Sequence, residues 1–169
     1  LSFDFIDSTV INNHIYPLTP YINQLQSLQV NIKESVTDIQ DNAFRNSDIF
    51  DAIEEIIIDN SSNILKTTAG FSQLSNLKYV QFPFTITEVN ENAFLDCTSL
   101  TNINITEFDS SINIINNNAF KGCTSLQKIS LPDHLQYIGN SAFESSGVTE
   151  IIYDITTVTN IGESIFKNS

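Results

Sequence analysis

Apolar residues in this chain recur in a fixed short pattern. Three segments read Leu-x-x-(Val or Ile)-x-(Phe, Ile or Leu), and they begin at Leu77, Leu100 and Leu126. Looser copies begin at Ile53 and Val148. The last apolar positions of each copy alternate with polar ones, and a period of two predicts a short strand with one buried face.

Two further apolar features keep phase with these strands. An apolar pair such as Ile86 and Val89 follows each strand, and an Ala-Phe pair such as Ala93-Phe94 comes next. Large apolar side chains at one repeat position are normally core, so we expect the rings to stack as an aromatic ladder. The phenylalanines at this position are Phe44, Phe71, Phe94, Phe120, Phe143 and Phe166, spaced 27, 23, 26, 23 and 23 residues apart.

A repeat of this length cannot bury its own apolar face. Stacked copies can, because each covers the next, and strands at one phase of successive turns must run parallel. The pattern therefore predicts a solenoid of about six repeats.

The segment from Cys123 to Phe143 reads Cys-x-Ser-Leu-x-x-Ile-x-Leu-Pro-x-x-Leu-x-x-Ile-x-x-x-Ala-Phe. It resembles the leucine-rich repeats of Treponema and BspA-like surface proteins, and the resemblance covers residues 27–169. It implies a leucine-rich-repeat solenoid with a concave sheet of short parallel strands and with turns or short helical segments on the convex side. Residues 1–26 do not fit and are expected to be an N-terminal cap or a degenerate repeat. No polar cap follows Phe166, so we expect the natural protein to continue beyond residue 169.

Charge and hydropathy narrow the choice of partner. Lys and Arg number 7 against 20 Asp and Glu, giving a formal net charge of −13, which argues against nucleic acid because phosphate binding needs clustered cations. The longest strictly apolar runs have three residues, such as Ile56-Ile57-Ile58, and are too short for membrane insertion. The first ten residues contain acids and no basic residue, so they are not a signal peptide.

The sequence contains no recognisable catalytic constellation. The two histidines, His14 and His134, have no suggestive Ser or Asp pattern, and the five Gly are too scattered for a phosphate loop. We therefore expect no enzyme activity, cofactor or metal. Cys97 and Cys123 occupy one repeat position and are expected to be buried free thiols, with a disulfide as the alternative.

The strand pattern leaves an outward stripe of polar and apolar side chains. Leucine-rich-repeat proteins usually bind through the concave sheet, so the resemblance implies a protein partner on this stripe. Tyr79 is its one large aromatic side chain, and we expect Ile57 and Asn102 beside it; the alternative is that Ile57 is buried. The candidate contact residues are Tyr79, Ile57, Gln81, Asn102, Asn104, Lys128, Glu55 and Glu150.

Two functions follow as hypotheses. The resemblance implies a non-catalytic protein-binding or adhesion module of a microbial surface or secreted protein. The alternative is a structural or scaffolding segment of an intracellular assembly, cytoplasmic or cytoskeletal. Glycosylation sequons at Asn60 and Asn104 are weak support for secretion.

Overall fold

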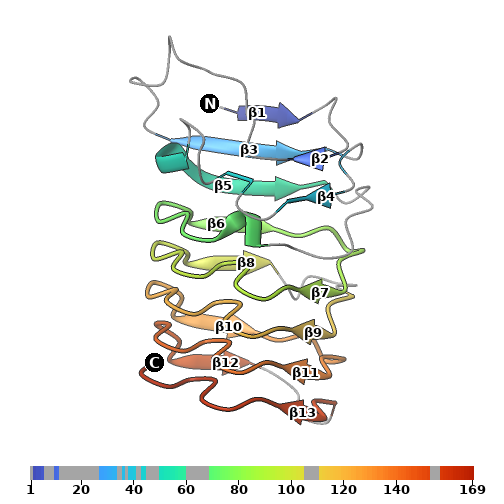
Figure 1. Ribbon diagram of the computed structural model, residues 1–169, viewed down its shortest axis with the longest axis vertical. Helices are drawn as coiled ribbons and strands as arrows, with labels where there is room; N and C mark the ends of the chain where they lie inside the picture. The colour runs from blue at the N-terminus through green and yellow to red at the C-terminus, as the bar shows by residue number, and fades with distance from the viewer. Residues whose placement is uncertain are drawn as a thin grey trace.

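The structure is a computed structural model, and it describes residues 2–5, 10–11, 27–33, 36, 38–40, 43–44, 50–59, 69–104, 111–152 and 157–169. Short strands are stacked from the N-terminus at one end to the C-terminus at the other (Figure 1). The expected leucine-rich-repeat solenoid with parallel strands is confirmed.

The Leu-x-x-Ile-x-Leu segments form a row of parallel strands, which we call the main ladder. Its strands are β1 (Ser2–Phe5), β3 (Leu28–Ile32), β5 (Ile53–Ile58), β6 (Tyr79–Gln81), β8 (Asn102–Asn104), β10 (Lys128–Ser130) and β12 (Glu150–Ile152). The first five pair in the order β1-β3-β5-β6-β8, and β10 pairs with β12. Burial alternates along β3 and β6, as the period of two requires.

The second apolar pair of each repeat forms a second parallel ladder, where the sequence predicted only turns or short helical segments. Its strands are β2 (Val10–Ile11), β4 (Asp38–Ile39), β7 (Glu88–Val89), β9 (Ile114–Ile115), β11 (Tyr137–Ile138) and β13 (Asn160–Ile161). The orders are β2-β4 and β7-β9-β11-β13. Two short 3₁₀ helices, η2 (Phe50–Ala52) and η3 (Ala69–Phe71), lie between main-ladder strands in the chain.

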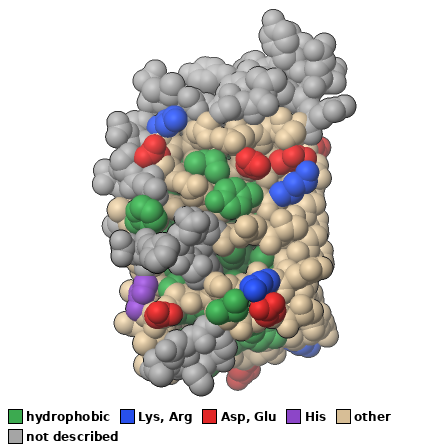
Figure 2. Space-filling model, turned by 180° about the vertical axis from the view of Figure 1, so that it is seen from behind, with side chains coloured by type: hydrophobic (Ala, Val, Ile, Leu, Met, Phe, Trp, Pro, Cys, Tyr) green, Lys and Arg blue, Asp and Glu red, His purple; other side chains and the backbone are tan. Residues whose placement is uncertain are grey.

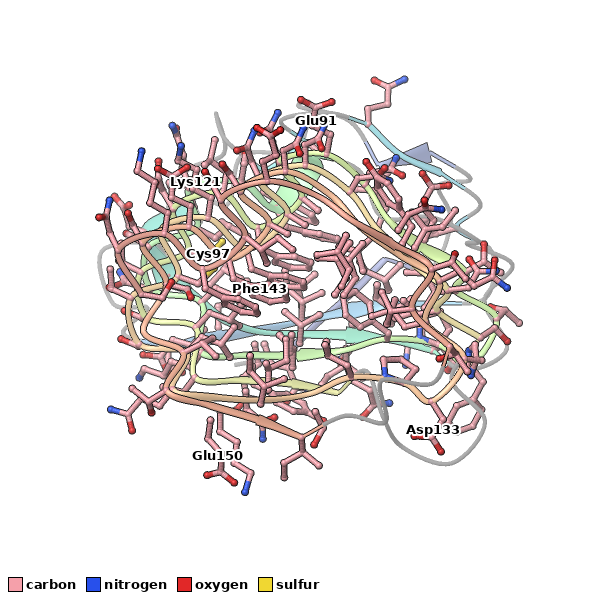
Figure 3. The ribbon with its side chains drawn as sticks, turned by 90° about the horizontal axis from the view of Figure 1, so that it is seen from below. Glu91, Cys97, Lys121, Asp133, Phe143 and Glu150 are labelled. Atoms are coloured by element: carbon pink, nitrogen blue, oxygen red, sulfur yellow. The ribbon has the colours of Figure 1, made fainter. Side chains whose placement is uncertain are left out.

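The six repeat phenylalanines stack as predicted. Neighbouring ring centroids are 5.8 Å apart for Phe44 and Phe71 and 5.3 to 5.4 Å apart for the other four pairs, with all five pairs near parallel. Seen along the stack in Figure 3, Phe143 lies in the interior between the two sides of each coil. The aromatic ladder is therefore the centre of the core.

The turns around Phe94, Phe120, Phe143 and Phe166 have left-handed residues two positions before and two positions after the ring. Around Phe94 these are Asn92 and Asp96, with φ of 58° and 59°. Asn, Asp, Ser and Gly occupy these positions in the later turns because they are common where backbone φ is positive. The backbone N–H groups of these two residues donate to the next repeat, Asn92 to the carbonyl of Asn117 at 3.1 Å and Asp96 to the carbonyl of Lys121 at 2.8 Å.

The N-terminal segment joins both ladders. Ser2–Phe5 pairs with Gln29–Ile32 of β3, and Val10–Ile11 pairs with Asp38–Ile39 of β4. Ser2–Phe5 and Val10–Ile11 thus extend the two ladders by one strand each.

Candidate functional site

The main ladder presents an outer face, which we define as the side chains that alternate with its buried residues. Ile56 and Ile58 are fully buried, whereas Ile57 between them is only half-buried. Val80 is likewise fully buried between the half-buried Tyr79 and Gln81. Ile57 therefore points away from the core with Tyr79, and the alternative that Ile57 is buried is wrong.

Strand register arranges the outer face in two columns that run along the stack. In the first column the paired residues are Gln29, Glu55, Tyr79 and Asn102, with Lys128 opposite Glu150 further along. In the second column they are Asn31, Ile57, Gln81 and Asn104, with Ser130 opposite Ile152.

This register corrects one sequence expectation. Tyr79 lies opposite Asn102 as predicted, but its other neighbour is Glu55, while Ile57 lies opposite Gln81. The reason is the repeat phase: Ile56 pairs with Val80, so the residue before Ile56 must meet the residue before Val80. Tyr79 and Ile57 are diagonal neighbours.

Most of the described charged groups on this side are paired. Lys78 Nζ lies 2.6 Å from Glu54 Oε1, and Lys128 Nζ lies 2.9 Å from Glu150 Oε1. Hydrogen bonds from Lys78 and Ser27 lower the pKa of Glu54 below its ordinary value. Glu55 makes no ion pair or hydrogen bond with the residues that the structure describes.

Sequence reasoning omitted Glu54 and Lys78 from the stripe. They occupy the first x of the Leu-x-x-Ile pattern, whereas the prediction took only positions beside the central apolar residue. Their opposite charges at the same repeat position were the signal that could have found the ion pair.

The described part of the outer face has no broad apolar patch. Figure 2 looks onto this side of the molecule and shows hydrophobic, acidic and basic side chains in small groups among other side chains and backbone. Among the described hydrophobic residues, Ile152 is 47% exposed in the second column and Phe84 is 41% exposed just after β6. A non-obligate protein interface is on the whole about as apolar as the rest of a protein surface, so it does not require a broad apolar patch.

Cys97 and Cys123 are buried free thiols, so the disulfide alternative is absent from this structure. Each Sγ donates to a phenylalanine carbonyl of the preceding repeat, at 3.1 Å to Phe71 and 3.2 Å to Phe94. Burial raises the pKa of Cys97 to about 12 and raises that of Cys123 well above its ordinary value. Both thiols are therefore protonated at neutral pH and poor nucleophiles.

The remaining candidate residues either form no recognisable site or lie outside the residues that the structure describes. His134 is an exposed turn residue, as expected. Within the described ranges, no group of three or more His, Cys, Asp and Glu side chains is placed to hold a metal ion. His14 and Asn60 lie outside the described residues. Asn104 has a described backbone in β8, but its side chain lies outside the description.

This chain belongs to the family of BspA-type leucine-rich repeat regions. The family model matches six copies, over residues 9–50, 20–107 and 48–169. Leucine-rich repeats of this kind typically mediate protein binding or adhesion and are generally non-enzymatic.

Two solved structures share the fold. A leucine-rich repeat protein from Bacteroides ovatus is 26% identical, with a TM-score of 0.68 over 86% of this chain and 36% of its own. A leucine-rich cell surface protein from Faecalibacterium prausnitzii is 17% identical, with a TM-score of 0.67 over 83% of this chain and 45% of its own. The chain thus spans less than half the length of either protein. No match was found among curated proteins.

A search of the described residues for membrane spans found no helix with the length and hydropathy to cross a bilayer.

Proposed function

We propose that this chain is a non-catalytic protein-binding or adhesion segment of a microbial surface or secreted protein, and that it binds its partner through the outer face of the main ladder. The observation that carries the proposal is the column in which Tyr79 lies between Glu55 and Asn102, with Gln81 and Ile57 in the column beside it.

Three physical features support binding at this place. The face belongs to a rigid ladder, so its side chains are positioned before a partner arrives and little ordering entropy is lost. Tyr79 is a large aromatic group with a polar tip, and tyrosine is enriched at interfaces and among residues that dominate binding energy. Polar groups surround it, as in the rim of a non-obligate interface.

The proposed location at the cell surface or outside the cell is supported by the family and by the fold. BspA-type repeats occur in surface proteins, and the F. prausnitzii structure is described as a cell surface protein. Antibody labelling of intact and permeabilised source cells separates this proposal from the scaffold alternative. Labelling of intact cells is expected, whereas labelling only after permeabilisation would favour an intracellular scaffold.

Site-specific photo-crosslinking tests the binding face. The photoreactive residue p-benzoyl-phenylalanine is placed at Asn102 on the outer face, or at Glu91 as the control. Figure 3 shows Glu91 on the opposite side of the coil from Glu150 of β12. Both chains are incubated with surface and secreted proteins from neighbouring cells. We expect one protein to crosslink to the photoreactive residue at position 102 and not to the one at position 91. An excess of the chain without the photoreactive residue should suppress this crosslink. Specific crosslinking from Glu91 alone would contradict the proposal.

A further inference from the structure

One carboxylate on the outer face differs from the other acids of its side. Glu54 is held by Lys78 and Glu150 is held by Lys128. Glu55 is exposed and has no ion pair or hydrogen bond to any described residue. An unpaired carboxylate beside an aromatic ring on a rigid strand is a ready acceptor for a cation supplied from outside.

The neighbouring rungs place further groups around Glu55. Tyr79 is its paired residue in β6, and Gln29 is its paired residue in β3. Parallel strands lie about 4.8 Å apart, so the three side chains follow one another at that spacing. Gln29 Nε2 donates to Asn31 Oδ1 at 2.7 Å, which orients the Gln29 side chain and leaves its amide oxygen as a second acceptor.

We propose that Tyr79, Glu55 and Gln29 form a site for an arginine side chain of the protein partner. A guanidinium group is planar, presents five N–H donors and is weakly hydrated. It can stack on the Tyr79 ring while donating to the Glu55 carboxylate and the Gln29 amide oxygen. The half-buried Ile57, diagonal to Tyr79, offers apolar contact to the aliphatic stem.

Charge and geometry favour arginine over the alternatives. The chain has a formal net charge of −13, so its field attracts a basic partner and repels an acidic one. Lysine has the charge but lacks the planar fork that can stack and reach two acceptors on successive rungs. The inference rests on the proposed function, because it specifies the partner chemistry of the same face.

Peptide titration followed by NMR tests the site. The probe is acetyl-Gly-Gly-Arg-Gly-Gly-amide, and the comparison peptides contain citrulline, the neutral isostere, or lysine in place of arginine. We expect saturable shifts at the Tyr79 ring and the Glu55 amide with the arginine peptide, weaker ones with lysine and none with citrulline. The affinity should fall about two- to fivefold in Glu55→Gln and in Tyr79→Leu, the size of exposed ion-pair and cation–π contacts.

Glu91→Gln is the matched control, because it removes the same charge from the opposite side of the coil. It should leave the Tyr79 shifts and the affinity unchanged. Equal binding of the citrulline peptide, unchanged affinity in Glu55→Gln, or the absence of saturable shifts would each overturn the arginine site. Crosslinking from Asn102 tests the binding face separately, so loss of the arginine assignment and loss of the proposed function give different results.

Discussion

Replacing Phe120 by Ala tests the aromatic ladder as the source of the solenoid's stability. The Phe120 ring is fully buried and stacks 5.3 Å from Phe94 on one side and 5.3 Å from Phe143 on the other. Truncating a buried Phe costs about 3–5 kcal/mol, through lost burial and the cavity left behind. Domains of ordinary stability have a free energy of unfolding of about 5–15 kcal/mol, so this one substitution removes a large part of the total.

Phe166 provides a matched comparison within the same ladder. It stacks on Phe143 alone and is 37% exposed. Phe166→Ala should therefore cost about 1.5–2.5 kcal/mol, roughly half the loss at a fully enclosed ring. Phe120→Leu keeps most of the apolar volume but loses both ring contacts, each of which contributes about 0.5–1.5 kcal/mol, so its cost should lie between the two.

Urea unfolding monitored by circular dichroism gives the three free energies. Native-state hydrogen exchange should show that the loss in Phe120→Ala reaches the neighbouring turns, because each repeat is stabilised by its neighbours. The Phe120 amide itself donates to the carbonyl of Ala142 in the next turn. A loss under about 1 kcal/mol in Phe120→Ala, or a loss no larger than in Phe166→Ala, would refute the reasoning.

Three further predictions concern the thiols, the glycines and the end of the stack. The raised thiol pKa of Cys97, about 12 against an ordinary value of 9.0, adds stability that is fully present below pH 9 and is lost as pH rises toward 12. Unfolding free energy should therefore fall less steeply above pH 9 in Cys97→Ser than in the parent, and an identical slope would contradict this. Gly139→Ala should cost about 2–3 kcal/mol, because its added Cβ would clash with the backbone nitrogen of Asn117, against about 1–2 kcal/mol for Gly122→Ala, where the nearest atom belongs to the movable Asp96 side chain and the cost is mainly that of a left-handed φ of 75°. Equal losses in urea unfolding would count against that account. Deleting residues 148–169 uncovers the enclosed ring of Phe143, so light scattering should show aggregation, and a monomeric soluble product would contradict the expectation.

The stacked core could be predicted from the sequence because its signal is periodic. The Ala-Phe spacing identified the ring ladder, and alternation around Ile56 and Val80 identified the buried strand face. The second ladder was not predicted, because a pair of apolar residues three apart, such as Ile86 and Val89, has no period-two signal.

The candidate site was predicted only in part, for reasons of register and pairing. The pattern identified Tyr79 as outward-facing, but it mispaired Tyr79 with Ile57, since alternation alone gives the face and not the partner on the next rung. Whether a neighbouring base neutralises a given acid depends on how the side chains pack, and the repeat pattern does not specify this. Glu54 and Glu55 are adjacent and chemically identical in the sequence, yet only Glu54 is held by Lys78.

Titration calorimetry with the purified partner, once crosslinking has identified it, tests most directly whether the outer face is the binding surface. The partner is titrated into the parent chain, into a Tyr79→Ser, Ile57→Asn double variant, and into Phe84→Ser. Phe84 is the control because it is an exposed aromatic residue that lies outside the two columns. Removing a tyrosine that dominates the binding energy costs about 2 kcal/mol or more, so we expect the double variant to lose about thirtyfold in affinity and Phe84→Ser to bind like the parent. Unchanged affinity in the double variant, with loss in Phe84→Ser, would contradict the assignment of binding to the outer face.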